Sequence, residues 1–305
     1  MLAAEAAPKE EAPTESAPTK GAAANSAVID SAAIDPTPQA PRGVVLKTTP
    51  LRESDLIVTL YTDAFGQVSA LARGARKSKR RFAGALSLLV LGRYQLTPPR
   101  RDLWTLESAV VDREWTRLAS DVVSVAHAAY IAEVVGAVMP AEAPEAGALD
   151  IIVSVWDALA AGGPSPAALR AAELALLEIA GHRPAIEHCA ACGETDLSSG
   201  AVFDPQRGGA ICRRCAAQSR NVGVRPLAPA TRNYLLALLA CESPLAARAL
   251  DSDPQFTPID RTAARDALVA MVVGLAGKPL RSLEYLAKLG AATRRAASDP
   301  RDRSG

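Results

Sequence analysis

Residues 55–72 read DLIVTLYTDAFGQVSALA, and this stretch sets the fold of the N-terminal part of the chain. Two runs rich in apolar and β-branched residues, 55–61 and 67–72, flank the turn residues Phe65 and Gly66. Such runs on either side of a short turn that contains glycine are typical of adjacent strands. The stretch therefore predicts two β-strands joined by a turn.

Working outward, three further short runs have the same texture. Residues 44–46 precede the stretch, while 93–97 and 103–106 follow it and are separated by two prolines. Five short strands with turn residues between them indicate a small barrel or sandwich. Five is the strand number of an OB-fold, although a five-stranded SH3-like barrel fits the same pattern.

From about residue 112 the apolar spacing changes to three and four residues, which predicts helices. Gly181 and Pro184 end the third of them. The predicted fold class is therefore α+β, with an N-terminal five-stranded barrel followed by an α-helical domain. The helices are expected at residues 116–139, 148–160, 166–180, 228–240, 261–276 and 282–289.

These patterns divide the chain into a barrel at 41–110 and a helical domain at 111–290, with a cysteine-bearing loop at 186–220. Residues 1–40 hold six acids, two lysines and no aromatic residue, and they are rich in alanine and proline. This composition buries too little apolar surface to offset chain entropy, so a disordered tail is expected. A second disordered tail is expected at 291–305.

Four cysteines in the loop form two Cys-x-x-Cys pairs. Cys189 and Cys192 are separated by nineteen residues from Cys212 and Cys215. This spacing is typical of a tetrahedral four-thiolate zinc site. The alternatives are two disulfides, which require an oxidising compartment, or four unconnected thiols. Because four protein ligands leave no open position for water or substrate, we expect one structural rather than catalytic Zn²⁺.

Neither a membrane span nor a secretory signal is expected. No run approaches the eighteen or so apolar residues of a membrane helix, and the N-terminus lacks the charged-then-apolar profile of a signal peptide. A cytoplasmic protein with reduced thiols is the expectation.

The charge distribution predicts a nucleic-acid site on the barrel. Between Ala64 and Arg101 there are nine cations and no acid, although the net charge of the chain is only +1. A solvated surface normally mixes both signs, so this span fits a polyanion footprint. Six of the cations lie in a loop between the third and fourth strands. The predicted DNA-binding residues are Arg73, Arg76, Lys77, Lys79, Arg80, Arg81 and Arg93.

Small barrels that bind single strands combine such a groove with aromatic side chains that stack on bases. The candidate stacking residues are Tyr61, Phe65, Phe82, Tyr94 and Trp104. The alternative is that these rings fill the barrel core. No base-specific geometry is visible, so sequence-tolerant binding to the phosphate backbone is expected, with an affinity that falls steeply with salt.

The sequence contains none of the catalytic motifs that its cysteines and cations could suggest. It lacks His-Glu-x-x-His, the phosphate-binding Gly-x-x-x-x-Gly-Lys-Ser/Thr and the Gly-x-Ser-x-Gly elbow. It also lacks the His-x-Glu and Pro-Cys-x-x-Cys pair of a zinc deaminase. We therefore expect a binding protein rather than an enzyme.

Several motifs, in order and with preserved spacing, resemble the RecO family of bacterial recombination mediators. The resemblance runs from about residue 42 to residue 290 and rests on segments spread over both domains. They are Gly43–Leu46, Glu53–Asp55, Thr62–Gly66, Leu71–Arg76, Gly181–Pro184, the two cysteine pairs with Phe203 and Gly208–Gly209 between them, and Pro279–Leu286.

The resemblance implies an N-terminal OB-fold, a helical C-terminal domain and a role in DNA repair and recombination. It also implies binding to single- and double-stranded DNA and annealing of complementary strands. The implied protein partners are RecR, the single-stranded DNA-binding protein and, indirectly, the recombinase RecA, in a cytoplasmic, nucleoid-associated setting. Two alternatives are a zinc-containing OB-fold adaptor that binds RNA or a transcription complex, and a scaffold that binds no nucleic acid.

Overall fold

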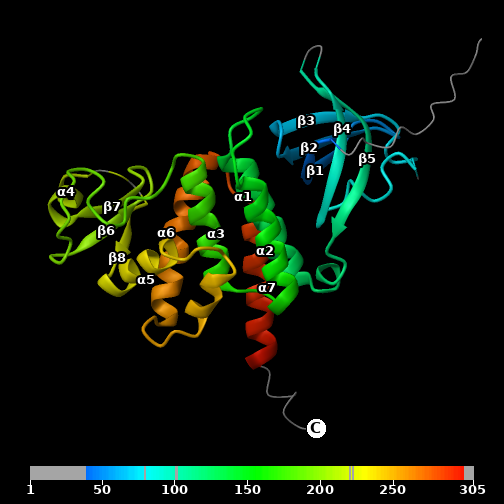
Figure 1. Cartoon of the computed structure of the whole chain (residues 1–305). Helices are drawn as coiled ribbons and strands as arrows, with labels where there is room; N and C mark the ends of the chain where they lie inside the picture. The colour runs from blue at the N-terminus through cyan, green and yellow to red at the C-terminus, as the bar shows by residue number, and fades with distance from the viewer. Residues whose placement is uncertain (1–38, 79, 100–101, 220, 222, 299–305) are drawn as a thin grey trace, which may run out of the picture. The chain divides into compact units, whose positions relative to one another are not determined.

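The computed structural model describes residues 39–78, 80–99, 102–219, 221 and 223–298. Its N-terminal part is a closed five-stranded barrel (Figure 1). The strands are β1 (Arg42–Pro50), β2 (Leu56–Thr62), β3 (Gly66–Ala72), β4 (Val90–Thr97) and β5 (Trp104–Glu114).

The order of the strands around the barrel is β1-β2-β3-β5-β4. The first strand pairs with β2 on one side and closes the barrel on β4 on the other, while β3 runs parallel to β5. This non-sequential order is that of a small Greek-key barrel, as in an OB-fold. The predicted fold class is confirmed.

The last strand is longer than the predicted run at 103–106. Its pairing with β4 extends from Thr97 opposite Thr105 to Val90 opposite Glu114. The sequence pattern missed this extension because residues 107–114 include several acids, which are depleted in strands. The final four residues of β5 are exposed, so the acids remain in water.

The helical part contains six helices of eleven or more residues in the part of the chain that the structure describes. They are α1 (Val122–Val138), α2 (Ala148–Gly162), α3 (Pro166–Ile179), α5 (Pro229–Leu239), α6 (Pro258–Ala276) and α7 (Arg281–Ser298). Two short 3₁₀ turns, Leu118–Ser120 and Ala246–Asp251, accompany them.

Capping residues explain where the helices differ from the predicted bounds. The first begins at residue 122 rather than 116, because the Asp121 side chain accepts hydrogen bonds from the backbone of Val123 and Ser124. Helix α6 begins three residues earlier than predicted, at Pro258, where Thr257 and Asp260 form a capping box. Helix α7 continues beyond the predicted residue 289 to Ser298, through a stretch rich in alanine and arginine, both of which favour helix.

The cysteine-bearing segment is more ordered than the predicted loop. It contains a three-stranded sheet of order β7-β6-β8 and a short helix, which we call together the cysteine module. Its elements are β6 (Ala201–Asp204), β7 (Gly209–Cys212), α4 (Arg213–Gln218) and β8 (Arg225–Leu227).

Two hydrophobic cores hold the chain together. One fills the barrel interior and includes Val58, Leu60 and Leu106. The other joins the helices, the cysteine module and outward-facing barrel residues such as Val44 and Leu91. The barrel is thus fixed to the helices by a shared apolar core rather than by a linker alone.

The connection between α1 and α2 also forms hydrogen bonds with the barrel. The backbone N–H of Glu142 donates to the carbonyl of Gln67 at 2.9 Å, and the hydroxyl of Tyr61 lies 3.2 Å from the backbone nitrogen of Glu145, which donates to it. Gly66, at the β2–β3 turn, has φ +63° and touches this connection so closely that a Cβ would lie 2.2 Å from the carbonyl oxygen of Ala143.

No helix within the described ranges is both long enough and apolar enough to cross a bilayer.

Replacing Gly66 with alanine is expected to destabilise the chain by about 2–5 kcal/mol. The left-handed backbone costs about 1–2 kcal/mol for a residue with a Cβ, and the overlap with Ala143 adds about 1–3 kcal/mol. Chemical denaturation followed by circular dichroism measures the change. Gly74→Ala is the matched control, because Gly74 has φ +65° and open space around its Cβ position. An equal loss in both variants would contradict the close contact.

Candidate functional site

The cation-rich segment between β3 and β4, residues 73–89, is held in place by the loop between β1 and β2. The backbone N–H of Gly74 donates to the carboxylate of Asp55 at 2.8 Å. This hydrogen bond is the main reason that the pKa of Asp55 lies below its usual value. The bond therefore forms with an ionised carboxylate, and such charge-assisted bonds are stronger than neutral ones.

Two further contacts bind the same loops together. The backbone N–H of Arg76 donates to the carbonyl of Ser54 at 3.0 Å, and the Arg76 guanidinium donates to the carbonyl of Glu53 at 3.1 Å. The amides of Lys77 and Ser78 turn back onto the carbonyl of Gly74. Hydrogen bonds therefore fix the backbone at the start of the cation-rich segment, from which the cationic side chains project.

Arg81 closes the part of this segment that we call the cationic turn, residues 73–81. Its Nη2 donates to the carbonyl of Arg73 at 2.9 Å, and its guanidinium lies 4.9 Å from the centre of the Phe82 ring. The carbonyl of Arg81 accepts the backbone N–H of Ala109 on β5. Its side chain therefore stabilises the loop, and it is less available to a ligand than its neighbours.

The structure brings five of the seven predicted DNA-binding residues together on this loop and places Arg93 elsewhere. Lys79 lies outside the described residues. Arg93 lies on β4, where its Nε donates to Asp112 of β5 at 3.3 Å. Among the described cations of the loop, the exposed side chains are those of Arg73, Arg76, Lys77 and Arg80.

Arg52, in the β1–β2 loop, is an exposed cation that the sequence pattern missed. Its charge, like that of Arg73, contributes to the lowered pKa of Asp55, which places it beside the cationic turn. It lies outside the acid-free span of residues 64–101, so only the packing of the two loops could have identified it.

Most of the candidate stacking residues belong to the protein interior. Tyr61, Phe82 and Tyr94 are between 0% and 3% exposed, and the hydroxyl of Tyr94 donates to the carbonyl of Ala85. Their interpretation as stacking platforms is wrong, because Phe82 and Tyr94 fill the barrel core and Tyr61 lies in the core shared with the helices. Trp104 is 8% exposed and Phe65 is half-buried.

The four cysteines of the two pairs converge. The sulfurs of Cys189, Cys192, Cys212 and Cys215 all lie within 4.8 Å of one another. The Cys192 and Cys212 sulfurs are 3.9 Å apart, close to the roughly 3.8 Å expected for sulfurs bound tetrahedrally at about 2.3 Å from one ion. The arrangement can hold a metal ion.

Backbone hydrogen bonds shape the cysteine cluster. The N–H of Gly193, at φ +77°, donates to the carbonyl of Cys189 and closes the first turn. The N–H of Ala190 donates to Ala210 at 2.7 Å and joins the two pairs. The N–H of Cys212 donates to the Cys189 sulfur at 3.3 Å.

Hydrogen bonds within the cluster shift the pKa values of three of its thiols in different directions. Burial opposes ionisation of Cys189, but backbone N–H donors, that of Cys212 first, outweigh it and lower the pKa of the Cys189 thiol to about 6. The Glu194 N–H lowers the pKa of Cys192. Hydrogen bonds to Cys192 and Cys212 raise the pKa of Cys215 to about 12. Cys189 and Cys192 therefore lose their protons more readily than ordinary cysteines, whereas Cys215 holds its proton more tightly.

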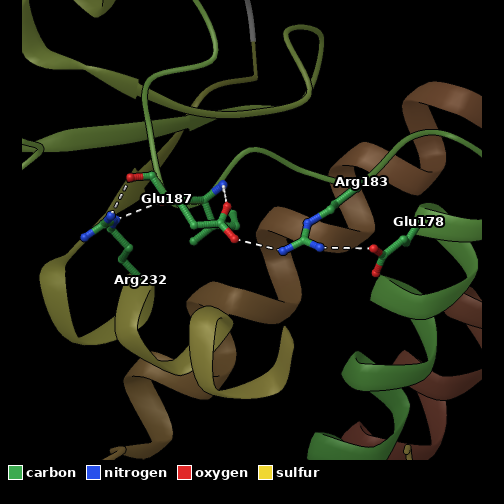
Figure 2. Close-up of polar contacts among 5 residues, drawn as sticks. Glu178, Arg183, Glu187 and Arg232 are labelled. Carbon is green, nitrogen blue, oxygen red and sulfur yellow. Dashed lines mark hydrogen bonds and ion pairs between the residues drawn. The ribbon is translucent and has the colours of Figure 1, made fainter. Parts of the chain in front are cut away.

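Residues 183–187, which we call the polar strap, connect α3 to the cysteine module and form polar contacts with α3 and α5 (Figure 2). The Arg183 guanidinium donates to Glu178 at 3.0 Å and to Glu187 at 2.8 Å. Arg232 donates to the backbone carbonyls of Ile186 at 2.8 Å and Glu187 at 2.9 Å. Because the charged groups are about half exposed, these bonds orient the strap more than they stabilise it.

Apolar burial fixes the module more firmly. Ile186, Phe203 and Ile211 have no exposed surface and belong to the same core as the helices. Gly209 packs so closely against Ala185 that a Cβ at position 209 would lie 2.4 Å from the Ala185 carbonyl oxygen. The cysteine cluster therefore lies in a module that is built into the helical core.

A cavity of about 820 Å³ lies between α1, α3, α6 and α7. Its walls are largely apolar and include Leu169, Val269 and Leu286. Arg170 lines it with a side chain only 6% exposed, ion-paired to the fully buried Glu173 at 2.5 Å. Its Nε and Nη1 have no hydrogen-bond partner. These two atoms are themselves buried, so the cavity offers mainly apolar surface to a bound group.

Comparisons with known proteins agree across both parts of the chain. Residues 40–113 match the family model for the recombination protein O N terminal, and residues 119–284 match that for the recombination protein O C terminal. The DNA repair protein RecO of Anaeromyxobacter sp. (strain K) is 39% identical over 250 residues, which cover 81% of this chain and 95% of that protein.

Two further relatives extend the comparison. The DNA repair protein RecO of Geobacter sulfurreducens is 37% identical over 172 residues, or 56% of this chain and 70% of the relative. That of Syntrophus aciditrophicus is 31% identical over 248 residues, or 80% of this chain and 93% of the relative.

Replacing Cys189 and Cys212 with serine is expected to abolish metal retention. Loss of two thiolates leaves the others unable to complete a tetrahedral site. Reduced protein is equilibrated with zinc, dialysed and assayed for bound metal by mass spectrometry, and the unaltered chain should retain one ion. Cys241→Ser is the control, because Cys241 lies outside the cluster. Retention of metal by the double variant would rule out the cluster as its ligand set.

Proposed function

We propose that this chain, which belongs to the RecO family of DNA repair proteins, is a recombination mediator that acts by binding and annealing DNA. It binds single- and double-stranded DNA, anneals complementary strands and, with RecR, helps to load the recombinase RecA. The observation that carries the proposal is the exposed, acid-free cationic turn, Arg73–Arg81, held on a rigid barrel.

The mechanism we propose is electrostatic. The exposed Arg73, Arg76, Lys77 and Arg80 neutralise phosphates and release condensed counterions. When two complementary strands share this neutralised surface, the repulsion between them falls and their bases can sample registers. No bond is made or broken, so the protein needs no catalytic group for this step.

The cysteine cluster has a supporting role in this mechanism. We propose that it holds one structural Zn²⁺, because an all-cysteine, four-coordinate set suits zinc and leaves no position open for substrate. When bound, the ion supplies structural cross-linking of the module. The residues that would hold it are Cys189, Cys192, Cys212 and Cys215.

The cavity of the helical domain is our proposed docking surface for a protein partner. Its apolar walls, lined also by the cations Arg261 and Arg265, favour an apolar segment that carries a carboxylate. RecR and the single-stranded DNA-binding protein are the proposed partners, and they are distinguished by experiment.

Replacing Arg76, Lys77 and Arg80 with alanine is expected to weaken binding to both single strands and duplex. If each side chain neutralises one phosphate, the slope of log K against log salt for single strands should fall by about 2. Fluorescence anisotropy with oligo(dT), a duplex and a matched RNA, over a range of salt, measures this, and annealing should slow in parallel.

The control for this variant removes the same charge from elsewhere. Arg117, Lys278 and Arg281 are exposed and lie outside the barrel, so their combined change to alanine should leave the slope nearly unchanged. An unchanged slope in the barrel variant would show that the cationic turn is not the binding site. A strong preference for RNA over DNA would favour the adaptor alternative.

Replacing Thr262 with glutamate is expected to weaken capture of one partner. Thr262 lies on the exposed rim of the cavity, where an added carboxylate would repel an anionic segment. Immobilised full-length variants are tested against purified RecR and purified single-stranded DNA-binding protein, with Thr262→Gln as the uncharged control. If the two variants capture both partners equally, the cavity is not the docking surface.

A further inference from the structure

Phe65 and Trp104 differ from the other aromatic residues of the barrel. Tyr61, Phe82 and Tyr94 are almost fully buried, whereas Phe65 is half-buried and the Trp104 ring lies against it, with ring centres 4.7 Å apart. This ring pair is therefore the part of the aromatic cluster that reaches the barrel surface, within the described residues.

The ring pair lies close to the cationic turn. Trp104 is in register with Ala70 on β3, and the cationic turn begins three residues further on, at Arg73. At about 3.3 Å per residue of strand, the separation along the backbone is about 10 Å. A strand whose phosphates contact the turn could therefore place a base near the rings.

A carboxylate covers this surface in the free protein. The Trp104 indole N–H donates to Glu142 at 3.0 Å. Glu142 itself is exposed and belongs to the α1–α2 connection rather than to the barrel. The edge of the indole is thus covered by a single carboxylate, which is also in contact with water. The negative charge of this carboxylate repels an approaching phosphate.

We infer that Phe65 and Trp104 form a stacking subsite for an unpaired base, which the Glu142 carboxylate covers until single-stranded nucleic acid displaces it. The inference rests on the proposed function, because the cationic turn must first hold the phosphates. An unpaired base offers a π face to the half-buried Phe65 ring, whereas the bases of a duplex are stacked on one another and cannot insert. The subsite therefore discriminates between single strand and duplex, which the cations alone do not.

The chain contains a useful optical reporter for this subsite. Trp104 is one of three tryptophans, and the other two, Trp115 and Trp156, are buried in the helical core. Stacking of a base on or beside Trp104 should quench its emission. Titration of the full chain with oligo(dT) is expected to quench fluorescence, and titration with a duplex of equal length is not.

Variants identify the quenched residue. Trp104→Phe should abolish quenching, while Trp156→Phe should preserve it. Phe65→Leu should weaken oligo(dT) binding threefold or more and leave duplex binding unchanged. Glu142→Ala should strengthen oligo(dT) binding threefold or more, and Glu142→Gln, which keeps an acceptor for the indole N–H, should have a smaller effect.

Glu107→Gln is the charge-matched control, because Glu107 is an exposed acid on β5 with no contact to Trp104 recorded in the structure. Equal strengthening by Glu107→Gln and Glu142→Ala, or strengthening of single-strand and duplex binding alike, would overturn the subsite and leave only general electrostatics. So would oligo(dT) binding by anisotropy without quenching. Absence of any binding by anisotropy would instead overturn the proposed function.

Discussion

The position of the cationic turn depends on the hydrogen bond between the Gly74 N–H and the Asp55 carboxylate. This bond joins the β1–β2 loop to the start of the cationic turn at 2.8 Å. A cluster of like charges repels itself and would spread if the chain were free to do so. The carboxylate offsets part of that repulsion and fixes the backbone, so that exposed guanidinium and ammonium groups remain concentrated on one side of a rigid barrel.

The chain separates recognition from support. The exposed cations stand on a barrel loop and touch their neighbours mainly through backbone groups. The cysteine cluster, by contrast, has all four sulfurs turned toward one point and sits on a module whose apolar residues share the helical core. The cysteine cluster, which is the more regular motif in the sequence, therefore belongs to the structural framework. The cationic turn, which is less regular, is the candidate binding site.

Local patterns predicted the parts of the fold that depend on local physics. The β2–β3 hairpin and the cysteine cluster follow from residue type and spacing, and both are present. The sequence could not show that Asp112 pairs with Arg93 or that Arg81 folds back onto Arg73, because these contacts depend on tertiary packing. The role of Arg52 and the burial of Tyr94 were hidden for the same reason, as was the sheet formed by β6, β7 and β8.

The central claim is that DNA binds the cationic turn and that the cysteine module supports the fold without contacting it. Hydrogen–deuterium exchange of the full chain, with and without saturating oligo(dT), tests this most directly. Our account predicts strong protection of peptides that cover residues 73–81 and little change in peptides that cover residues 189–215. Protection confined to residues 189–215, with none at the barrel loop, would contradict it.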